Sequence, residues 1–242
     1  MEGSVTGVMI KARLGSTRFP QKHIHRLGDT TMIQQLIRKA KRLLGVDPII
    51  IETSWLEEDD HLEDIAHDED VECFRGHPVN LFERDMACYD EYGMEYALWI
   101  SGDCPLFDPR ISQRLIDACW RWPGHEAYSA EPTLHKPMGG TTSDIHSAGW
   151  VAGYKDLLYT HPTPDLMWEH YWVIPREIDT MEIDCDDIMP KQWTPIETSV
   201  DYPLQLAILN VVIDYLGYFP RDYSDVARAF RSVRSLAIMP EE

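Results

Sequence analysis

The sequence predicts an α/β fold in which a mostly parallel, or mixed, sheet is flanked by helices. In the first half of the chain, short apolar runs typical of strands alternate with segments whose apolar residues recur every three or four positions, as in amphipathic helices. Only short connections separate them, so each strand, helix and strand should form a right-handed crossover between parallel strands. No internal repeat or linker is present, and we expect one domain over residues 1–242.

The first half predicts four strands and four helices. Thr31 and Gln34 can open the first helix as a capping box, and Gly45 can end it. The unbroken apolar run at 96–100 is typical of a strand buried on both faces. In chain order we expect a strand at 8–10, a helix at 32–44, a strand at 48–51, a helix at 62–66, a strand at 71–74, a helix at 81–92, a strand at 96–100 and a helix from Pro109, capped by Asp108.

The second half is less regular. Residues 122–124 and 132–142 are rich in Pro, Gly and Thr and predict long loops, and a strand is expected near 143–147. We expect helices at 148–159, 165–173, 203–216 and 224–236.

The composition excludes several classes of protein. The 22 Lys and Arg against 41 Asp and Glu give a formal net charge of −19, which argues against binding to nucleic acid or to an anionic membrane. No apolar run approaches the length of a membrane span, and the first residues do not resemble a signal peptide, so we expect a cytoplasmic protein. The five cysteines form no Cys-x-x-Cys pair and predict neither a disulfide framework nor a zinc site.

A cationic loop follows the first strand of this acidic chain. Gly15 and Ser16 would let the backbone approach an anion, and the surrounding cations could bind phosphate oxygens. A surface loop whose cations pair with the many carboxylates explains the pattern equally well. The cations are Lys11, Arg13, Arg18 and Lys22.

Two carboxylates stand at the ends of predicted strands. Asp103 follows the apolar run at 96–100, and Asp201 ends the run at 196–200. Ligands of open α/β sheets bind at the carboxyl ends of strands, so the two could hold a divalent metal against phosphates. Taken alone, Asp103 is more typical of a turn and Asp201 of a helix cap than either is of a metal ligand.

Residues 11–22, Lys-Ala-Arg-Leu-Gly-Ser-Thr-Arg-Phe-Pro-Gln-Lys, resemble the signature of the cytidylyltransferases related to 3-deoxy-manno-octulosonate cytidylyltransferase and to the spore coat polysaccharide biosynthesis cytidylyltransferase. Later segments resemble family blocks in the same order: Phe74-Arg75-Gly76 with Leu81 and Arg84, Gly102-Asp103-Cys104-Pro105-Leu106, Trp168-Glu169-His170 and Ser199-Val200-Asp201-Tyr202-Pro203. The resemblance spans most of the chain.

This resemblance implies a Rossmann-like, glycosyltransferase-A-like nucleotidyltransferase fold and a homodimer that transfers CMP from CTP to a small acidic acceptor, a sugar acid or a phosphate or phosphonate metabolite, and releases pyrophosphate. Residues 1–125 would bind the nucleotide, and residues 126–242 the acceptor and the second subunit. By position, Arg13, Lys22 and Asp103 would be catalytic. Arg13, Gly15, Ser16, Arg18, Lys22, Thr53 and Arg84 would bind CTP, Asp103 and Asp201 would bind Mg²⁺, and Lys136, Glu169 and His170 would bind the acceptor.

Four positions depart from the family pattern, and two other functions stay open. Gln21 replaces a usual Gly and Asn80 a usual Asp, while Leu204 and Gln205 replace an acidic pair. One alternative is a glycosyltransferase that binds a nucleotide-sugar through Asp184 and Asp186. The other is a nucleotide-binding homologue without catalytic activity.

Overall fold

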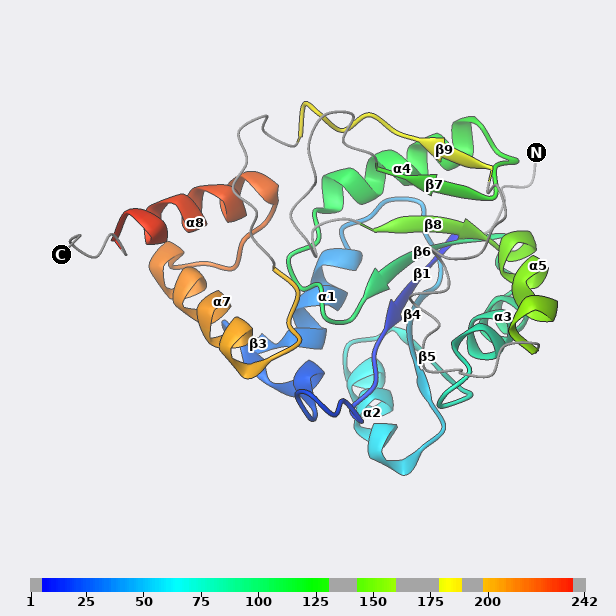
Figure 1. The fold of residues 1–242 in the computed structure, drawn as a ribbon, viewed down its shortest axis with the longest axis horizontal. Helices are drawn as coiled ribbons and strands as arrows, with labels where there is room; N and C mark the ends of the chain where they lie inside the picture. Colours follow the sequence, from blue (N-terminus) through cyan, green and yellow to red (C-terminus); the bar gives the residue numbers. More distant parts are fainter. Residues whose placement is uncertain (1–5, 131–142, 160–178, 189–197, 237–242) are drawn as a thin grey trace.

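The computed structural model describes residues 6–130, 143–159, 179–188 and 198–236. A central sheet of seven strands runs through them (Figure 1) in the order β5-β4-β1-β6-β8-β7-β9. β5, β4, β1 and β6 pair in parallel, β8 is antiparallel to β6 and β7, and β9 is parallel to β7. The strands are β1 (Thr6–Lys11), β4 (Ile49–Ser54), β5 (Glu72–Gly76), β6 (Tyr96–Ser101), β7 (Ala127–Ser129), β8 (Asp144–Ser147) and β9 (Thr180–Glu182).

Helices cover both faces of the sheet. They are α1 (Met32–Ala40), α2 (Asp60–Asp68), α3 (Leu81–Tyr92), α4 (Pro109–Arg121), α5 (Ala148–Tyr159), α7 (Pro203–Leu216) and α8 (Tyr223–Leu236). Short 3-10 turns η1 (Lys22–Ile24) and η2 (Glu57–Asp59) and the hairpin β2 (Arg26–Leu27) with β3 (Thr30–Thr31) complete the described elements.

The side chains of each strand point alternately to the two faces of the sheet, so the core has two layers. Val8 and Ile10 of β1 pack with residues of α1, α2 and α4, whereas Met9 packs on the opposite face with Trp99 and with residues of α3 and α5. Side chains that alternate along a strand point to opposite faces of the sheet. The sheet is therefore sandwiched between helices, as the sequence predicts.

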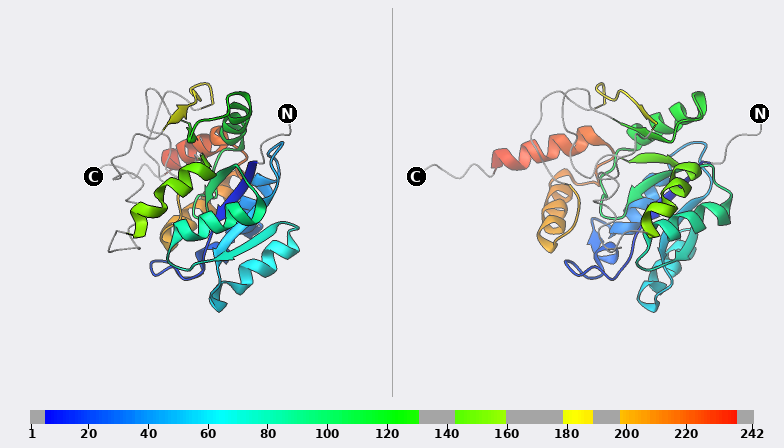
Figure 2. Two further views of the ribbon diagram at one scale, coloured as in Figure 1. Left: turned by 90° about the vertical axis from the view of Figure 1, so that its right-hand side faces the viewer. Right: turned by 45° about the vertical axis from the view of Figure 1, so that its right-hand side comes forward.

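α7 and α8 stand at the opposite end of the molecule from α3 and α5 (Figures 1 and 2). Asn210 of α7 fastens this end to the hairpin: its Oδ1 accepts from the Gly28 N–H at 2.9 Å, and its Nδ2 donates to the Arg26 carbonyl at 3.1 Å. The end of the chain is thus tied to a loop near its start.

The predicted fold class is confirmed, as are the expected strands and helices except the run at 196–200, whose described residues 198–200 form no strand, and the loop expected at 132–142 lies outside the described residues. The capping box of Thr31 and Gln34 forms, but α1 ends at Ala40 instead of extending to residue 44. β7 and β9, with three residues each, were not predicted. The helix expected at 165–173 lies outside the described residues. Within the described ranges, no helix is both long and apolar enough to cross a membrane.

Candidate functional site

The order of the strands creates a crevice beside β1. β1 lies between β4, the next strand of the sheet along the chain, and β6. The connections after β1 and β6 therefore lead to opposite sides, which opens a crevice of the kind that binds ligands in open α/β sheets. A cavity of about 420 Å³ lies there. Its lining comprises Lys11, Ala12, Arg13, Gly15, Ser16, Thr17, Arg18, Lys22, His23, Val79, Leu81, Arg84, Ser101 and Asp103.

Lys22 joins the two carboxylates that the sequence singles out. Its Nζ lies 3.0 Å from Asp103 Oδ2 and 3.2 Å from Asp201 Oδ1. Arg18 Nη2 lies 2.9 Å from the same Asp201 oxygen. Cations from the start of the chain therefore meet carboxylates from two distant segments, at Asp103 and Asp201, at the edge of the cavity.

The environment of Asp103 favours its ionised form. Burial alone would raise the pKa of this carboxyl, but the Lys22 ammonium and a hydrogen bond from Ser101 Oγ hold its pKa below the ordinary value. Gly102 precedes it, and a Cβ there would come within 2.5 Å of the Lys11 carbonyl oxygen. The Gly102 N–H donates to that carbonyl at 2.8 Å, which holds the loop after β6 against the end of β1, and only a residue without a Cβ fits so close to it.

Backbone and side-chain bonds fix the segment that carries Asp201. The Val200 N–H donates to the Asp103 carbonyl at 2.8 Å, so the two acidic loops are directly joined. Gln205 Oε1 accepts from the N–H groups of Asp201 at 2.7 Å and Tyr202 at 2.8 Å, and it caps the start of α7. The departure from the family pattern at Gln205 thus has a structural role, whereas Leu204 beside it is exposed.

A buried carboxylate that the sequence does not reveal, that of Asp59, holds the backbone of the cationic loop. Asp59, which is only 1% exposed, accepts from the Leu14 N–H at 2.6 Å and from the Ser54 hydroxyl. The Leu14 carbonyl in turn accepts from the Gln21 N–H at 2.9 Å. Gln21 has a φ of 57°, the left-handed conformation that favours glycine, which accounts physically for the Gly expected there.

Three predicted nucleotide contacts line the cavity with this loop. Arg13 is exposed, and its Nη1 donates to the Pro78 carbonyl at 3.4 Å. Gly15 lies against Glu58, and the Ser16 hydroxyl accepts from the Phe19 N–H at 3.3 Å. Arg13, Gly15 and Ser16 therefore share the cavity with Arg18 and Lys22.

Two other basic residues of the lining belong to a buried ion-pair network. Lys11 Nζ lies 2.7 Å from Asp85 Oδ1 and 3.3 Å from the centre of the Trp99 ring. Arg84, 3% exposed, donates from Nε to Glu52 Oε1 at 2.9 Å. Acidic partners inside the protein thus balance the charges of Lys11 and Arg84, whereas Arg13 makes only the carbonyl contact among the described residues.

Thr53 is not brought to the cavity. Its side chain is fully buried on β4 and does not contribute to the lining, because it points to the face of the sheet opposite Glu52. Thr53 is therefore the one predicted nucleotide contact that does not line this cavity.

His23 is a lining residue that the sequence analysis missed. Burial and the neighbouring Lys22 lower the pKa of His23 to about 4, so the ring is neutral at pH 7. Its Nδ1 lies 3.0 Å from the Gly102 carbonyl and donates to it. His23 therefore links the turn that carries Lys22 to the loop that carries Asp103. Only its position directly after Lys22 could have suggested this.

The remaining predicted residues lie elsewhere. Lys136, Glu169 and His170 fall outside the described residues. Asn80 caps α3, its Oδ1 accepting from the Glu83 N–H at 3.1 Å. Asp184 accepts from the N–H of Asp186 at 2.8 Å within a turn, and neither residue lines the cavity.

The two converging carboxylates are suited to Mg²⁺. This ion is commonly held by one or two carboxylates and by the phosphates of its substrate. The described residues contain no group of three or more His, Cys, Asp or Glu placed to hold a metal. Asp103 and Asp201 both form an ion pair with Lys22. Together with the oxygens of a triphosphate, these two carboxylates could hold one Mg²⁺ ion.

Comparisons with known proteins agree with this geometry. The cytidylyltransferase family model matches residues 8–122. The spore coat polysaccharide biosynthesis protein SpsF of Bacillus subtilis is 28% identical over 114 residues, 46% of this chain and 48% of that protein. The 8-amino-3,8-dideoxy-manno-octulosonate cytidylyltransferase of Shewanella frigidimarina is 30% identical over 127 residues, 48% of each. The matches thus span about half the length of these relatives.

The likeness of the fold extends over the whole chain. A cytidylyltransferase structure from Leptospira borgpetersenii superposes with a TM-score of 0.79 at 20% identity and covers 99% of this chain and 98% of its own. Residues 8–122 contain the cationic loop and Asp103, whereas Asp201 lies outside the matched segment. The chain is thus a relative of the cytidylyltransferases that has their nucleotidyltransferase fold, with residues 8–122 as its family segment.

Proposed function

We propose that the protein transfers CMP from CTP to a small acidic acceptor, a sugar acid or a phosphate or phosphonate metabolite, and releases pyrophosphate. The observation that carries this proposal is the convergence of Lys22, Asp103 and Asp201 at the mouth of the cationic cavity. The nucleotidyltransferase fold and the cytidylyltransferase relatives support it.

The residues of the cavity would divide the work of this reaction. Arg13, Arg18 and Lys22 would hold the triphosphate, and the backbone at Gly15 and Ser16 would approach it closely. Bound Mg²⁺, held by Asp103 and Asp201, would stabilise the charge that develops on the departing pyrophosphate.

The balance of bonds requires no nucleophile from the protein. An acceptor oxygen forms a bond to the α-phosphorus, the bond from the α-phosphorus to its bridging oxygen breaks, and pyrophosphate leaves with the electron pair, while the proton of a hydroxyl acceptor is released to the solvent. His23, neutral at pH 7, would keep the loops of Lys22 and Asp103 in place.

The acceptor pocket and the dimer interface are assigned to residues 126–242. Lys136, Glu169 and His170 are the proposed acceptor contacts. For the second subunit we favour α7, because exposed apolar side chains recur along one face of it: Leu204, Ile208, Val211 and Tyr215, between 43% and 70% exposed. Such a stripe is typical of an interface between subunits.

Thermal unfolding with CTP, UTP, ATP, GTP and dTTP, each with and without Mg²⁺, tests the nucleotide site first. We expect CTP with Mg²⁺ to stabilise the wild type, by about 2.7 kcal/mol at 100 times its Kd, and Asp103→Asn to lose this effect. Asp68→Asn, a change at an exposed position of α2, is the matched control. No stabilisation by any triphosphate would contradict the proposal.

Pyrophosphate release then separates the proposed reaction from its alternatives. A glycosyltransferase that uses Asp184 would lose its activity in Asp184→Asn and keep it in Arg18→Gln. For CMP transfer we expect Arg18→Gln to lose pyrophosphate release and Asp184→Asn to keep it. A homologue without catalytic activity would bind CTP and release no pyrophosphate with any sugar acid or phosphonate supplied.

A further inference from the structure

A second cavity lies between α1 and the end of α7, away from the candidate nucleotide site. It encloses about 620 Å³, within the range of small-molecule sites, and shares no lining residue with the nucleotide cavity. One wall is the face of α1 and its following turn that carries Gln35, Arg38, Lys39 and Arg42. The other comes from residues 213–219.

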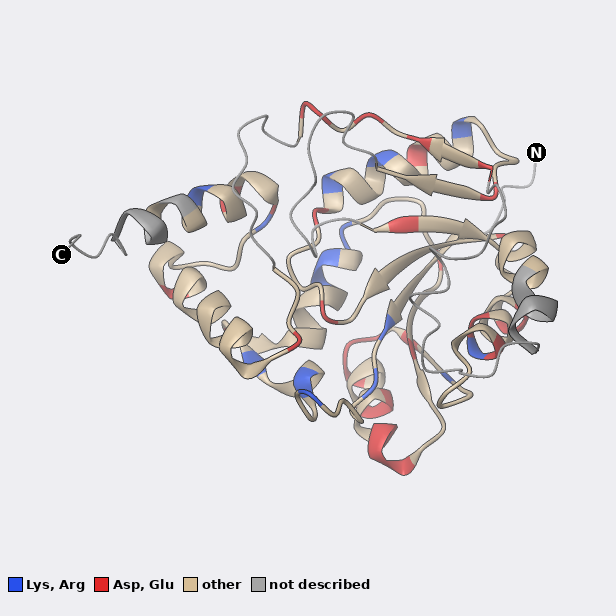
Figure 3. Ribbon diagram, in the orientation of Figure 1, with Lys and Arg blue, Asp and Glu red and all other residues tan. Residues whose placement is uncertain are grey.

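Cations dominate this cavity in a chain of net charge −19. Arg26, Arg38, Lys39 and Arg42 line it against only two carboxylates, Asp29 and Asp214. Arg42, in the turn after α1, follows Arg38 by four positions and Lys39 by three, the spacing of neighbours on a helix surface. Figure 3 shows the basic residues gathered on α1.

Two of the cations are held in place by neighbouring groups. Arg38 Nη1 lies 2.8 Å from Asp29 Oδ2, and Gln35 Nε2 donates to Asp29 Oδ1 at 2.9 Å. These hydrogen bonds, that of Arg38 first, lower the pKa of Asp29. Arg26 donates from Nε to the Gly28 carbonyl at 2.9 Å. Asp29 thus orients one guanidinium and balances one charge.

The other two cations have no anionic partner within ion-pair distance among the described residues. Lys39 is 1% exposed, and its Nζ donates to the Phe107 carbonyl at 2.9 Å. Burial, with a contribution from nearby Arg42, lowers the pKa of Lys39 to about 7, against the pull of Asp108. Arg42 is exposed at the cavity. The positive charges of Lys39 and Arg42 repel each other, and a bound anion would stabilise both.

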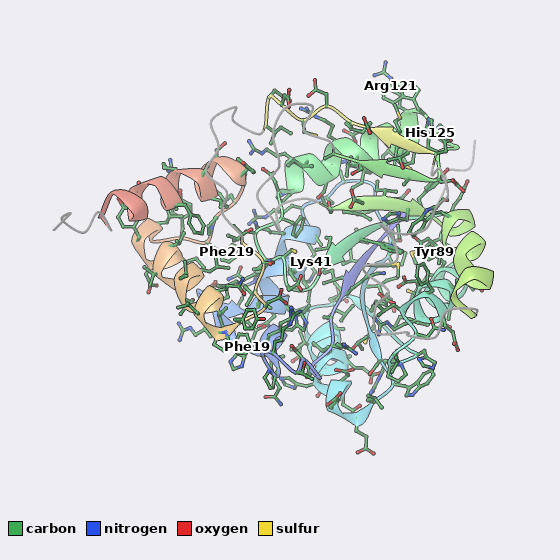
Figure 4. The ribbon with its side chains drawn as sticks, viewed as in Figure 1. Phe19, Lys41, Tyr89, Arg121, His125 and Phe219 are labelled. Carbon is green, nitrogen blue, oxygen red and sulfur yellow. The ribbon has the colours of Figure 1, made fainter. Side chains whose placement is uncertain are left out.

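The walls also offer apolar surface. Ile213, Tyr218 and Phe219 line the side opposite α1, and Lys39 Nζ lies 5.3 Å from the centre of the Phe219 ring. Figure 4 labels Phe219 beside the connection between α7 and α8. Guanidinium forks match the oxygens of a phosphate, and the volume exceeds what a bare phosphate fills.

We propose that the cavity between α1 and α7 is a second ligand site, which binds a small phosphate monoester through Arg42, Arg38 and Lys39 and packs its organic part against Tyr218 and Phe219. Because no residue is shared with the nucleotide cavity, this site can exist whether or not the chain transfers CMP.

Calorimetric titration of the full chain with phenyl phosphate, in a buffer free of phosphate and sulfate, tests the proposal. We expect saturable binding that Arg42→Gln weakens roughly tenfold or more, since a charge-assisted pair is lost. Arg121→Gln is the matched control: Figure 4 shows Arg121 on the far side of the molecule from Phe219. Arg42 makes no hydrogen bond to a described residue that its loss would disrupt, and circular dichroism verifies the fold.

Further variants assign the binding event and the ligand class. Arg18→Gln should leave this event intact, because Arg18 lines the other cavity. Equal affinity in the wild type, Arg42→Gln and Arg121→Gln would overturn the proposal, as would binding that only Arg18→Gln removes. We expect inorganic phosphate to bind more weakly than phenyl phosphate, and equal affinities would overturn the assignment to an ester.

Discussion

The ammonium of Lys22 lies 3.0 Å from Oδ2 of Asp103, and the lysine side chain is almost fully buried. Burial fixes the ammonium, and its three donors can bridge both carboxylates and a triphosphate. Asp201 Oδ1, at 3.2 Å, is the second contact of the same nitrogen. The geometry therefore makes Lys22 the residue on which the proposed chemistry depends most.

Lys22→Gln should lower kcat/KM for CMP transfer by roughly 100-fold or more, because a preorganised cation at the developing charge is lost. Pyrophosphate release at subsaturating CTP measures this effect. Lys41→Gln, an exposed change at the end of α1, should leave the rate unchanged. A rate of Lys22→Gln within threefold of the wild type would show that the lysine is only structural.

Gln21→Gly should stabilise the protein. The left-handed conformation at Gln21 costs a residue with a Cβ about 1 to 2 kcal/mol, and the greater chain entropy of glycine offsets part of this, so we expect a gain of about 1 kcal/mol. Urea denaturation measures it. Gln21→Ala keeps a Cβ and should change stability little, and an equal gain in both variants would contradict the argument from φ.

Gln205→Ala should destabilise the start of α7. Two backbone donors lose their acceptor, which costs about 1 kcal/mol in the free energy of unfolding. Because one of these donors belongs to Asp201, the affinity for CTP with Mg²⁺ should also fall. Gln205→Glu retains an acceptor at the same place and should keep most of the stability. Equal stability of Gln205→Ala and the wild type would rule out the cap.

His23 should make the protein sensitive to mild acid. Its folded pKa of about 4 lies below the ordinary 6.5, so the unfolded chain binds more protons between these values and acid favours unfolding. Between pH 7 and pH 5 the free energy of unfolding should fall by about 2 kcal/mol through this group.

His23→Asn keeps a donor for the Gly102 carbonyl and removes the titration. Denaturation at pH 7, 6 and 5 should therefore show a shallower loss of stability in this variant than in the wild type. His67→Asn changes an exposed ring and should follow the wild type. His146, whose pKa burial lowers to about 3, acts equally in all three proteins. An unchanged slope in His23→Asn would refute the assignment.

Val211→Glu should dissociate the proposed homodimer. A carboxylate in the middle of the exposed apolar stripe of α7 would be buried without a partner at the interface. Light scattering after size exclusion gives the mass. Asp214→Glu, on the same helix but outside the stripe, preserves its charge and serves as the control. A monomeric wild type would disprove this interface.

Periodicity was sufficient to predict the layers of the fold but not the far edge of the sheet. α3, α5 and α7 have the bounds expected from the sequence, 81–92, 148–159 and 203–216. β7 and β9 are too short for a period of two to be recognised, and the pairing of β7 with β8 and of β9 with β7 is set by contacts distant in sequence.

The candidate site was predictable where chemistry coincides with the end of a strand. Asp103 and the cationic loop could be found in this way, because the carboxyl ends of parallel strands meet at one edge. Asp59 and His23 could not, since their roles depend on a carbonyl or an N–H that only tertiary packing brings near. Thr53 was predicted to contact the nucleotide but does not line the cavity. Because both faces of β4 are buried, the sequence does not indicate to which face its side chain points.

The hydrogen bond from Val200 to the Asp103 carbonyl has a consequence for the timing of synthesis. Lys22 and Asp201, which meet at this point, are 179 residues apart in the chain. A ribosome-bound chain that has emerged only as far as α4 carries the cationic loop and the first carboxylate, Asp103, but lacks the second, Asp201. Domains fold largely as units while they emerge. Unfinished chains therefore cannot assemble the pair of acids, and the protein gains its complete site only when α7 has left the ribosome.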